Sequence, residues 1–144
     1  MTKDQRIKVK PRTNGPTAVM WAPAPAHHDY PSAASFLRLL AGPKTVELCT
    51  ALLAQGPTVH QFAKDVLRAA RLPLLSADDP AVAKDLAKVA AGEALSPILL
   101  IRGDLASGRA LQIADGYHRV CASYHLSEDT LIPCRLVSLP AIIG

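Results

Sequence analysis

Apolar residues recur every three or four positions through the first half of the chain, which is the spacing of an amphipathic helix. Three successive segments show this pattern, and the first two end at a Gly-Pro pair, which stops a helix. In the third segment the apolar stripe consists of Val59, Phe62, Val66 and Ala69. The pattern predicts three short helices, over residues 32–42, 44–56 and 57–73.

A fourth helix is predicted over residues 79–91. Asp79 and Pro80 are residue types favoured at the N-cap and at the first helical position, and Gly92 is typical of a helix C-terminus. Upstream of all these helices, residues 22–33 are rich in proline. Because proline lacks an amide N–H and restricts the residue before it, this segment is expected to be an extended connector.

The periodicity changes after the fourth helix. Short apolar runs predict strands over 97–102 and 109–114, joined by the loop sequence GDLASG. A helix over 117–126 follows, and then a strand over 129–139 in which Pro133 predicts a break or a sheet edge. This order predicts an α+β fold, with a small sheet in the C-terminal half packed by helices and an all-helical N-terminal extension.

The length of 144 residues fits one domain with one core. We therefore expect residues 16–144 to form a single domain, with the helical part at 16–75 and the sheet at 76–144. The longest uncharged apolar run, SPILLI, is too short to cross a bilayer, and no signal-peptide pattern opens the chain. These features predict a cytoplasmic protein with no membrane partner.

The positive charge is concentrated at the N-terminus. Residues 1–12 hold five of the sixteen Lys and Arg and one of the twelve acidic residues, so the rest of the chain has eleven of each sign. We expect residues 1–15 to be a flexible basic tail. A solubilising role and contact with nucleic acid both fit such a tail, and nucleic acid is the less favoured partner.

The three cysteines are widely spaced and form no metal-binding or redox pair. Cys49, Cys121 and Cys134 all have apolar neighbours, which predicts small buried thiols in a reducing compartment. Cys121 falls early in a predicted helix, where a thiolate would be favoured.

Chemistry-bearing residues gather in the sequence DGYHR, between a predicted strand and a predicted helix. Asp115 is expected to cap the helix, and Gly116 to allow a sharp turn. The free amides of Tyr117, His118 and Arg119 would then point outward with partial positive charge. Together with the Arg119 guanidinium and the His118 imidazole, they would form a receptor for a phosphoryl group or another oxyanion.

Arg102 closes the preceding strand, from which it could reach the same end of the sheet. The alternative is structural: Asp115 only caps the helix, Arg119 pairs with Asp115 or Glu128, and His118 is a surface imidazole.

Residues 96–138 resemble the ParB/sulfiredoxin fold group. In that group a proline-led strand, a hairpin, a G-x-[HR]-R turn into a helix and a final strand containing Ile-Pro follow in this order. The helix over 79–91 also resembles the element that precedes this strand in ParB N-terminal domains. The resemblance implies a ParB/sulfiredoxin-like small mixed sheet.

The resemblance also implies a nucleotide ligand. In sulfiredoxin the turn reads G-G-C-H-R, and its His and Arg hold phosphates; here Gly116, His118 and Arg119 match, while Tyr117 stands in place of the nucleophilic cysteine. The D-G-H-H-R turn of free-serine kinases is closer, since Asp115 matches as well. The arginine pair of ParB, which binds CTP, is not present here.

Two functions remain open from the sequence. The first is a nucleotide-dependent phosphotransferase, in which Arg102 and Arg119 hold the phosphates of ATP, ADP or CTP with Mg²⁺, His118 stabilises the transferred group, and Asp115 is a base or metal contact. Asp104 is a further candidate for a Mg²⁺ contact. The second is a non-catalytic module that senses a phosphorylated or other anionic ligand, or binds another protein.

Overall fold

Helices and strands are interleaved along residues 18–139, which the computed structural model describes. The predicted basic tail at 1–15 lies outside these residues. The α+β class is confirmed. In chain order the elements are β1 (Met20–Trp21), α1 (Asp29–Leu37), α2 (Pro43–Gln55), β2 (Thr58–Phe62), α3 (Ala63–Ala70), α4 (Pro80–Ala90), β3 (Ala94–Leu95), β4 (Ile98–Ile101), β5 (Gln112–Asp115), α5 (Tyr117–Leu126) and β6 (Leu131–Val137).

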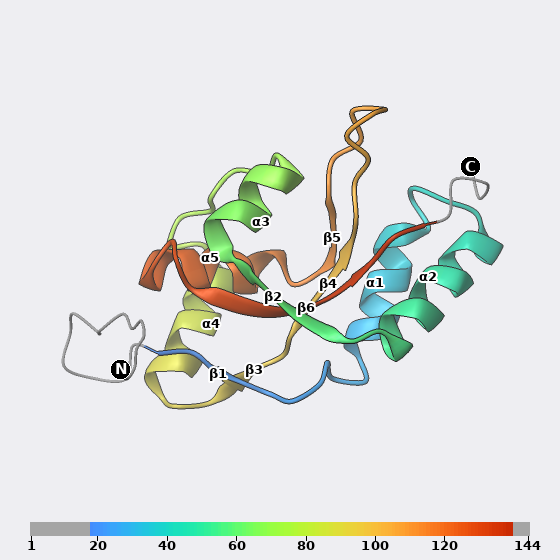
Figure 1. Ribbon diagram of the computed structural model, residues 1–144. Coiled ribbons are helices and arrows are strands. Elements are labelled where there is room, and N and C mark those ends of the chain that lie inside the picture. The colour runs from blue at the N-terminus through green and yellow to red at the C-terminus, as the bar shows by residue number, and fades with distance from the viewer. Residues whose placement is uncertain (1–17, 140–144) are drawn as a thin grey trace, which may run out of the picture.

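The main sheet is mixed and has the strand order β2-β6-β4-β5 (Figure 1). The pairs β2–β6 and β4–β5 are antiparallel, whereas β4 and β6 run parallel. Parallel neighbours need a crossover between them, and β5 with α5 provides it. The short strands β1 and β3 form a separate parallel pair.

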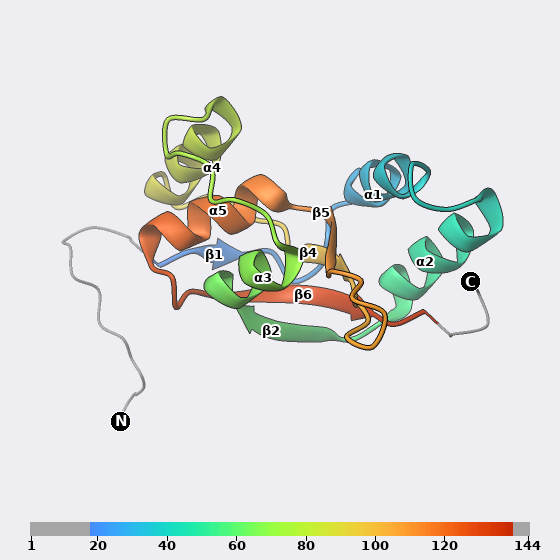
Figure 2. The ribbon, with the colours of Figure 1, turned by 90° about the horizontal axis from the view of Figure 1, so that it is seen from above.

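Helices pack on both faces of the central strand. Ile98 and Leu100 of β4 belong to a core with α3 and α5, while the alternate residues Leu99 and Ile101 pack with α1 and α2. Figures 1 and 2 show α3, α4 and α5 grouped on one side of the molecule and α1 and α2 on the other. A strand buried on both faces has an uninterrupted apolar sequence, which explains the run ILLI.

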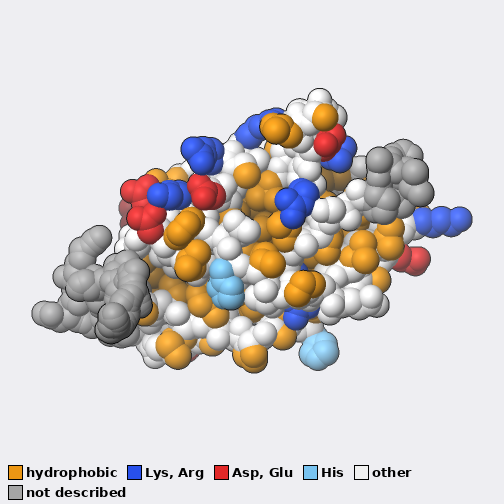
Figure 3. All heavy atoms as spheres, in the orientation of Figure 1, with side chains coloured by type: hydrophobic (Ala, Val, Ile, Leu, Met, Phe, Trp, Pro, Cys, Tyr) orange, Lys and Arg blue, Asp and Glu red, His pale blue; other side chains and the backbone are white. Residues whose placement is uncertain are grey.

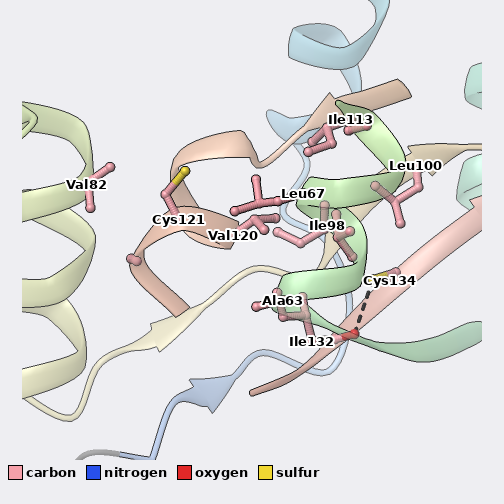
Figure 4. Close-up of a cluster of buried hydrophobic side chains, with 13 residues drawn as sticks. Ala63, Leu67, Val82, Ile98, Leu100, Ile113, Val120, Cys121, Ile132 and Cys134 are labelled. Carbon is pink, nitrogen blue, oxygen red and sulfur yellow. Dashed lines mark hydrogen bonds between the residues drawn. The ribbon is translucent and has the colours of Figure 1, made fainter. Parts of the chain in front are cut away.

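The core beneath α3 and α5 is close-packed. Figure 4 shows Leu67 of α3 and Val120 of α5 directed toward Ile98, between the two helices and the strands. The Cys134 thiol at this core donates a hydrogen bond of 3.2 Å to the main-chain carbonyl of Ile132. Cys49, Cys121 and Cys134 are all buried and unbridged, as predicted.

The prediction of one helix over residues 57–73 is wrong, and so is that of an all-helical N-terminal extension. Thr58–Phe62 is the edge strand β2, and the helix α3 starts only at Ala63. Every residue of β2 pairs with β6, whose hydrogen bonds decide the conformation of this short stretch. The first amides of α3, from Ala63 and Lys64, then donate to the carbonyls of Thr130 and Glu128.

The proline-rich connector also ends earlier than predicted. Helix α1 begins at Asp29 and contains Pro31 in its first turn, so residues 29–33 are helical. The missing N–H of Pro31 causes no loss there, since the first amides of any helix have no partner within it.

The remaining predicted elements are confirmed, with shifted ends. Asp79 caps α4 by accepting from the amides of Ala81 and Val82, at 3.1 Å each. Pro133 does not break β6. The parallel pairing with β4 starts at Cys134, so Pro133 lies where β6 borders β2 alone.

Candidate functional site

The DGYHR turn joins β5 to α5 as predicted, although its cap differs. Gly116 is the N-cap residue, with φ 115°, and Asp115 makes no capping hydrogen bond. A Cβ atom at Gly116 would lie 2.5 Å from Cδ1 of Ile98 and 3.2 Å from Nη2 of Arg119. Glycine is therefore required both by the positive φ and by the close approach of these side chains.

Arg119 is held by the protein's own oxygen atoms. Its Nη2 donates to Oδ2 of Asp115 at 2.6 Å, and its Nη1 donates to the Ser96 carbonyl at 2.8 Å. Oδ2 of the buried Asp29 lies 3.5 Å from Nη1. Only 13% of the Arg119 side chain is exposed. Both terminal nitrogen atoms are thus engaged, and the structural alternative, an Arg119–Asp115 pair, is the observed arrangement.

A small polar pocket of about 270 Å³ surrounds this ion pair. Its other charged groups include Lys88 and the carboxylate of Asp85 from α4. Burial raises the pKa of Asp115; the Arg119 charge opposes this shift, and the neighbouring Asp29 charge adds to it. Burial raises the pKa of Asp85 as well. A pocket in which three carboxylates face Arg119 and Lys88 does not favour an anion.

Tyr117 and His118 turn toward the segment that precedes α4. The Tyr117 hydroxyl donates to the Pro73 carbonyl at 2.6 Å. Nε2 of His118 lies 4.0 Å from Oδ2 of Asp79, and about half of its side chain is exposed. Within the described chain, no residue accepts a hydrogen bond from the main-chain amides of Tyr117, His118 or Arg119. These amides are thus the part of the predicted receptor that has no hydrogen-bond acceptor among the described residues.

Arg102 does not join this group, which corrects the expectation that it reaches the same end of the sheet. In the antiparallel pair β4–β5, Asp115 lies opposite Leu99, at the start of β4, while Arg102 follows the end of β4. The two arginines therefore lie at opposite ends of the pair, and they border different pockets.

Arg102 borders a larger pocket, of about 430 Å³, between α3 and the hairpin that joins β4 to β5. Figure 3 shows hydrophobic side chains in the hollow between these elements, with Lys and Arg side chains around it. We call it the arginine pocket. Its charged lining residues are Arg68, Arg71, Arg102, Arg109, Asp65 and Asp104.

Two hydrogen bonds hold the hairpin against the end of α3, and these two elements form the walls of the arginine pocket. Nη1 of Arg71 donates to the Gly108 carbonyl at 2.9 Å, and the Leu111 amide donates to the Ala69 carbonyl at 3.1 Å. Arg71 itself has a left-handed backbone, with φ 58°. Such a conformation is uncommon in a non-glycine residue, and it places this side chain at the hairpin.

The arginines of the pocket differ in how far they are neutralised. Arg68 pairs with Asp65 at 3.2 Å. Arg102 donates from Nε to the Ser138 hydroxyl at 2.8 Å, and its two terminal nitrogen atoms make no hydrogen bond to any residue between 18 and 139. Among residues 18–139, no carboxylate lies within ion-pair distance of Arg71, Arg102 or Arg109. These three cations give the pocket its positive character.

Asp104 belongs to the hairpin itself. The Ser107 amide donates to its carboxylate at 3.2 Å, and hydrogen bonds from Ser107 lower the pKa of Asp104. The hairpin is tight at Gly103, where a Cβ atom would clash with the main-chain carbonyl of Arg109. Across the described part of the chain, no three His, Cys, Asp or Glu side chains gather as a metal site.

At Cys121, the effect of burial on the thiol pKa is larger than any effect of its position near the start of a helix. Burial raises the pKa of this thiol, contrary to the expectation that a thiolate would be favoured there. Its neighbours are the apolar side chains of the core.

Comparison with known proteins identified no relative of this chain. No family model, no curated protein and no solved structure matches the chain. Among the helices of residues 18–139, none combines the length and the apolar character needed to cross a bilayer.

Two residues of the arginine pocket were predicted from the sequence to bind a ligand: Arg102 as a phosphate contact and Asp104 as a Mg²⁺ contact. Arg68, Arg71 and Arg109 come from α3, its end and the hairpin, which meet only in the folded chain. The spacing of Arg68 and Arg71 on one predicted helix was the available signal. It gave no partner for them, because the hairpin lies more than thirty positions further along.

Proposed function

We propose that the protein binds a small anionic ligand, of the phosphate or phosphate-ester class, in the arginine pocket. The observation that carries this proposal is the set of four arginines around one cavity. Among residues 18–139, three of them have no carboxylate within ion-pair distance, and Asp104 acts on Arg109 only at longer range. Arginine offers planar pairs of N–H donors that match phosphate oxygens. A pocket volume of about 430 Å³ falls in the range of about 300–1,000 Å³ that is usual for small-ligand sites.

The sequence led us to expect a nucleotide ligand. Its phosphates fit the arginine pocket better than they fit the DGYHR turn. At the turn, a phosphate would have to displace the Asp115 carboxylate from Arg119. At the arginine pocket, the terminal nitrogen atoms of Arg102 are available to a phosphate without such an exchange. The proposal concerns binding alone, since Asp115 and His118, the residues suggested for catalysis, do not line the pocket.

Membership of the ParB/sulfiredoxin fold group stays a proposal. It is supported by the order β4, hairpin, turn, α5 and β6, with Ile132 and Pro133 in the last strand. The edge strand β2 and the helices α1 and α2 on the second face of the sheet are features that the resemblance does not cover.

A thermal-shift titration with inorganic pyrophosphate tests the binding proposal. A ligand at 100 times its Kd stabilises the folded state by about 2.7 kcal/mol, which raises the Tm by several degrees. We expect this shift in the wild type and its loss in Arg102→Met and Arg109→Met. Arg38→Met removes an equally exposed guanidinium that lies outside the pocket, and it should retain the shift.

Two results would overturn the proposal. One is a wild type that pyrophosphate does not stabilise. The other is a shift that survives in both pocket variants. If that shift is lost in His118→Asn instead, the anion binds at the start of α5, as the resemblance implies.

A further inference from the structure

The floor of the arginine pocket is apolar. Its accessible part comes from Ala69 of α3 and from the half-buried Leu111 and Leu136. Val66 and Leu100 also line the pocket, but they are only 2% and 1% exposed. Val66 and Leu100 are otherwise part of the hydrophobic core. A bare phosphate would engage the arginines and leave the accessible part of this floor, at Ala69, Leu111 and Leu136, in contact with water.

One further apolar side chain borders the same cavity from the hairpin. Leu105, at the tip of the hairpin, is 98% exposed, more than any other large apolar residue of the described chain. An exposed leucine has no need of explanation by itself. This one lies next to an apolar floor and a group of cations, where an apolar ligand group would remove part of its surface from water.

We propose that the arginine pocket selects anions that carry an apolar ring. The ring lies on the accessible part of the floor, Leu105 covers it from the hairpin, and the charged end meets Arg102 and Arg109. This inference rests on the proposed function and adds the class of ligand. Its physical basis is that small-ligand sites combine a mainly apolar lining with a few placed polar groups.

The test compares two phosphate monoesters of equal charge by isothermal titration calorimetry. One is 1-naphthyl phosphate, which carries a ring, and the other is glycerol 3-phosphate, which carries only hydroxyl groups. We expect 1-naphthyl phosphate to bind at least about tenfold more tightly, because burial of about 60 Å² of apolar surface is enough for that factor.

Leu105→Ser is the matching variant, because an almost fully exposed side chain can be changed without disturbing the core. It should weaken the binding of 1-naphthyl phosphate by about threefold and leave glycerol 3-phosphate unchanged. Leu39→Ser changes another exposed leucine, 82% exposed and outside the pocket, and should alter neither affinity.

The outcomes separate this inference from the proposed function. Equal affinity for the two esters would overturn the selection of a ring and leave anion binding in place. Failure of both esters to bind would overturn the proposed function as well. An unchanged affinity ratio in Leu105→Ser would remove Leu105 from the site.

Discussion

Replacement of Arg119 by methionine should destabilise the fold, and the effect should depend on pH. The substitution removes the cation that lies 2.6 Å from Asp115 and 3.5 Å from Asp29, and both carboxylates are largely buried. Two unit charges about 4 Å apart attract by about 4 kcal/mol at an effective dielectric constant of 20. Loss of one partner of a buried pair costs about 3–5 kcal/mol, and we expect the free energy of unfolding to fall by this amount near neutral pH.

The pH dependence follows from the direction of the Asp115 pKa. Burial already raises this pKa in the wild type, and the Arg119 charge opposes the shift, so the variant should have a still higher value. A carboxyl group with a raised pKa binds its proton more readily in the folded state. Its unfavourable effect on stability is therefore absent below the unfolded-state pKa, near about 4, and grows as the pH rises toward the folded-state value. The cost of Arg119→Met should consequently be smaller at about pH 5 than at about pH 8.

Urea unfolding followed by circular dichroism at the two pH values measures both effects. Arg102→Met is the matched control: its guanidinium is at the surface and, among residues 18–139, bonds only to the Ser138 hydroxyl, so the expected change is within about 0.5 kcal/mol. Asp115→Asn combined with Arg119→Met should cost less than the two single changes added together, because the pair is coupled. An Arg119→Met variant as stable as the wild type, or equally destabilised at both pH values, would refute this account of the turn.

Three further predictions concern the described fold. Gly116→Ala should lower the free energy of unfolding in urea by about 2 kcal/mol or more, because it combines a positive φ with a clash against Ile98; an unchanged midpoint would contradict the geometry. Asp79→Ala should cost about 1 kcal/mol through loss of the α4 cap, whereas Asp78→Ala, at a neighbouring position that does not cap the helix, should cost almost nothing in the same assay. Burial raises the pKa of Cys134 to about 12, so a disulfide reagent at pH 8 should modify this thiol only as fast as the protein unfolds; rapid labelling of the native protein would show that the thiol is accessible.

Local signals account for the elements that the sequence predicts well. The Asp79-Pro80 start and the Gly92 end bound α4 because capping depends on neighbouring residues alone. The run of four apolar residues in β4 is explained by burial on both faces of the sheet. Such features need no knowledge of distant parts of the chain.

Strand β2 shows where local reasoning fails. The five residues from Thr58 to Phe62 also fit a helical stripe that continues into α3. Their conformation is decided by pairing with β6, where Thr58 lies opposite Arg135, 77 positions away. A short segment with an ambiguous period takes the structure that its distant partner imposes.

The candidate site also has a part that could be predicted from neighbouring residues and a part that could not. The four-residue spacing of Asp115 and Arg119 on a helix start indicates the observed ion pair, and this alternative was visible in the sequence. The contribution of Asp29 was not, because its position depends on how α1 packs against β5. The arginine pocket depends in turn on α3 meeting the hairpin between β4 and β5; the sequence predicted this hairpin but not its contact with α3.

The contrast between Arg119 and Arg102 decides where an anion should bind. Arg102 follows β4, and Arg119 lies in α5, which follows β5. The DGYHR motif made Arg119 the more prominent candidate in the sequence. An arginine contributes to binding only with donors that the protein has not already engaged, because a ligand must otherwise replace an existing charge-assisted hydrogen bond of similar strength. Arg119 is engaged by a carboxylate at 2.6 Å and a carbonyl at 2.8 Å, whereas Arg102 keeps both terminal nitrogen atoms available beside a cavity. The geometry therefore favours a stabilising role for the conspicuous motif, and the proposed anion binding rests on the arginines that have no carboxylate within ion-pair distance among residues 18–139.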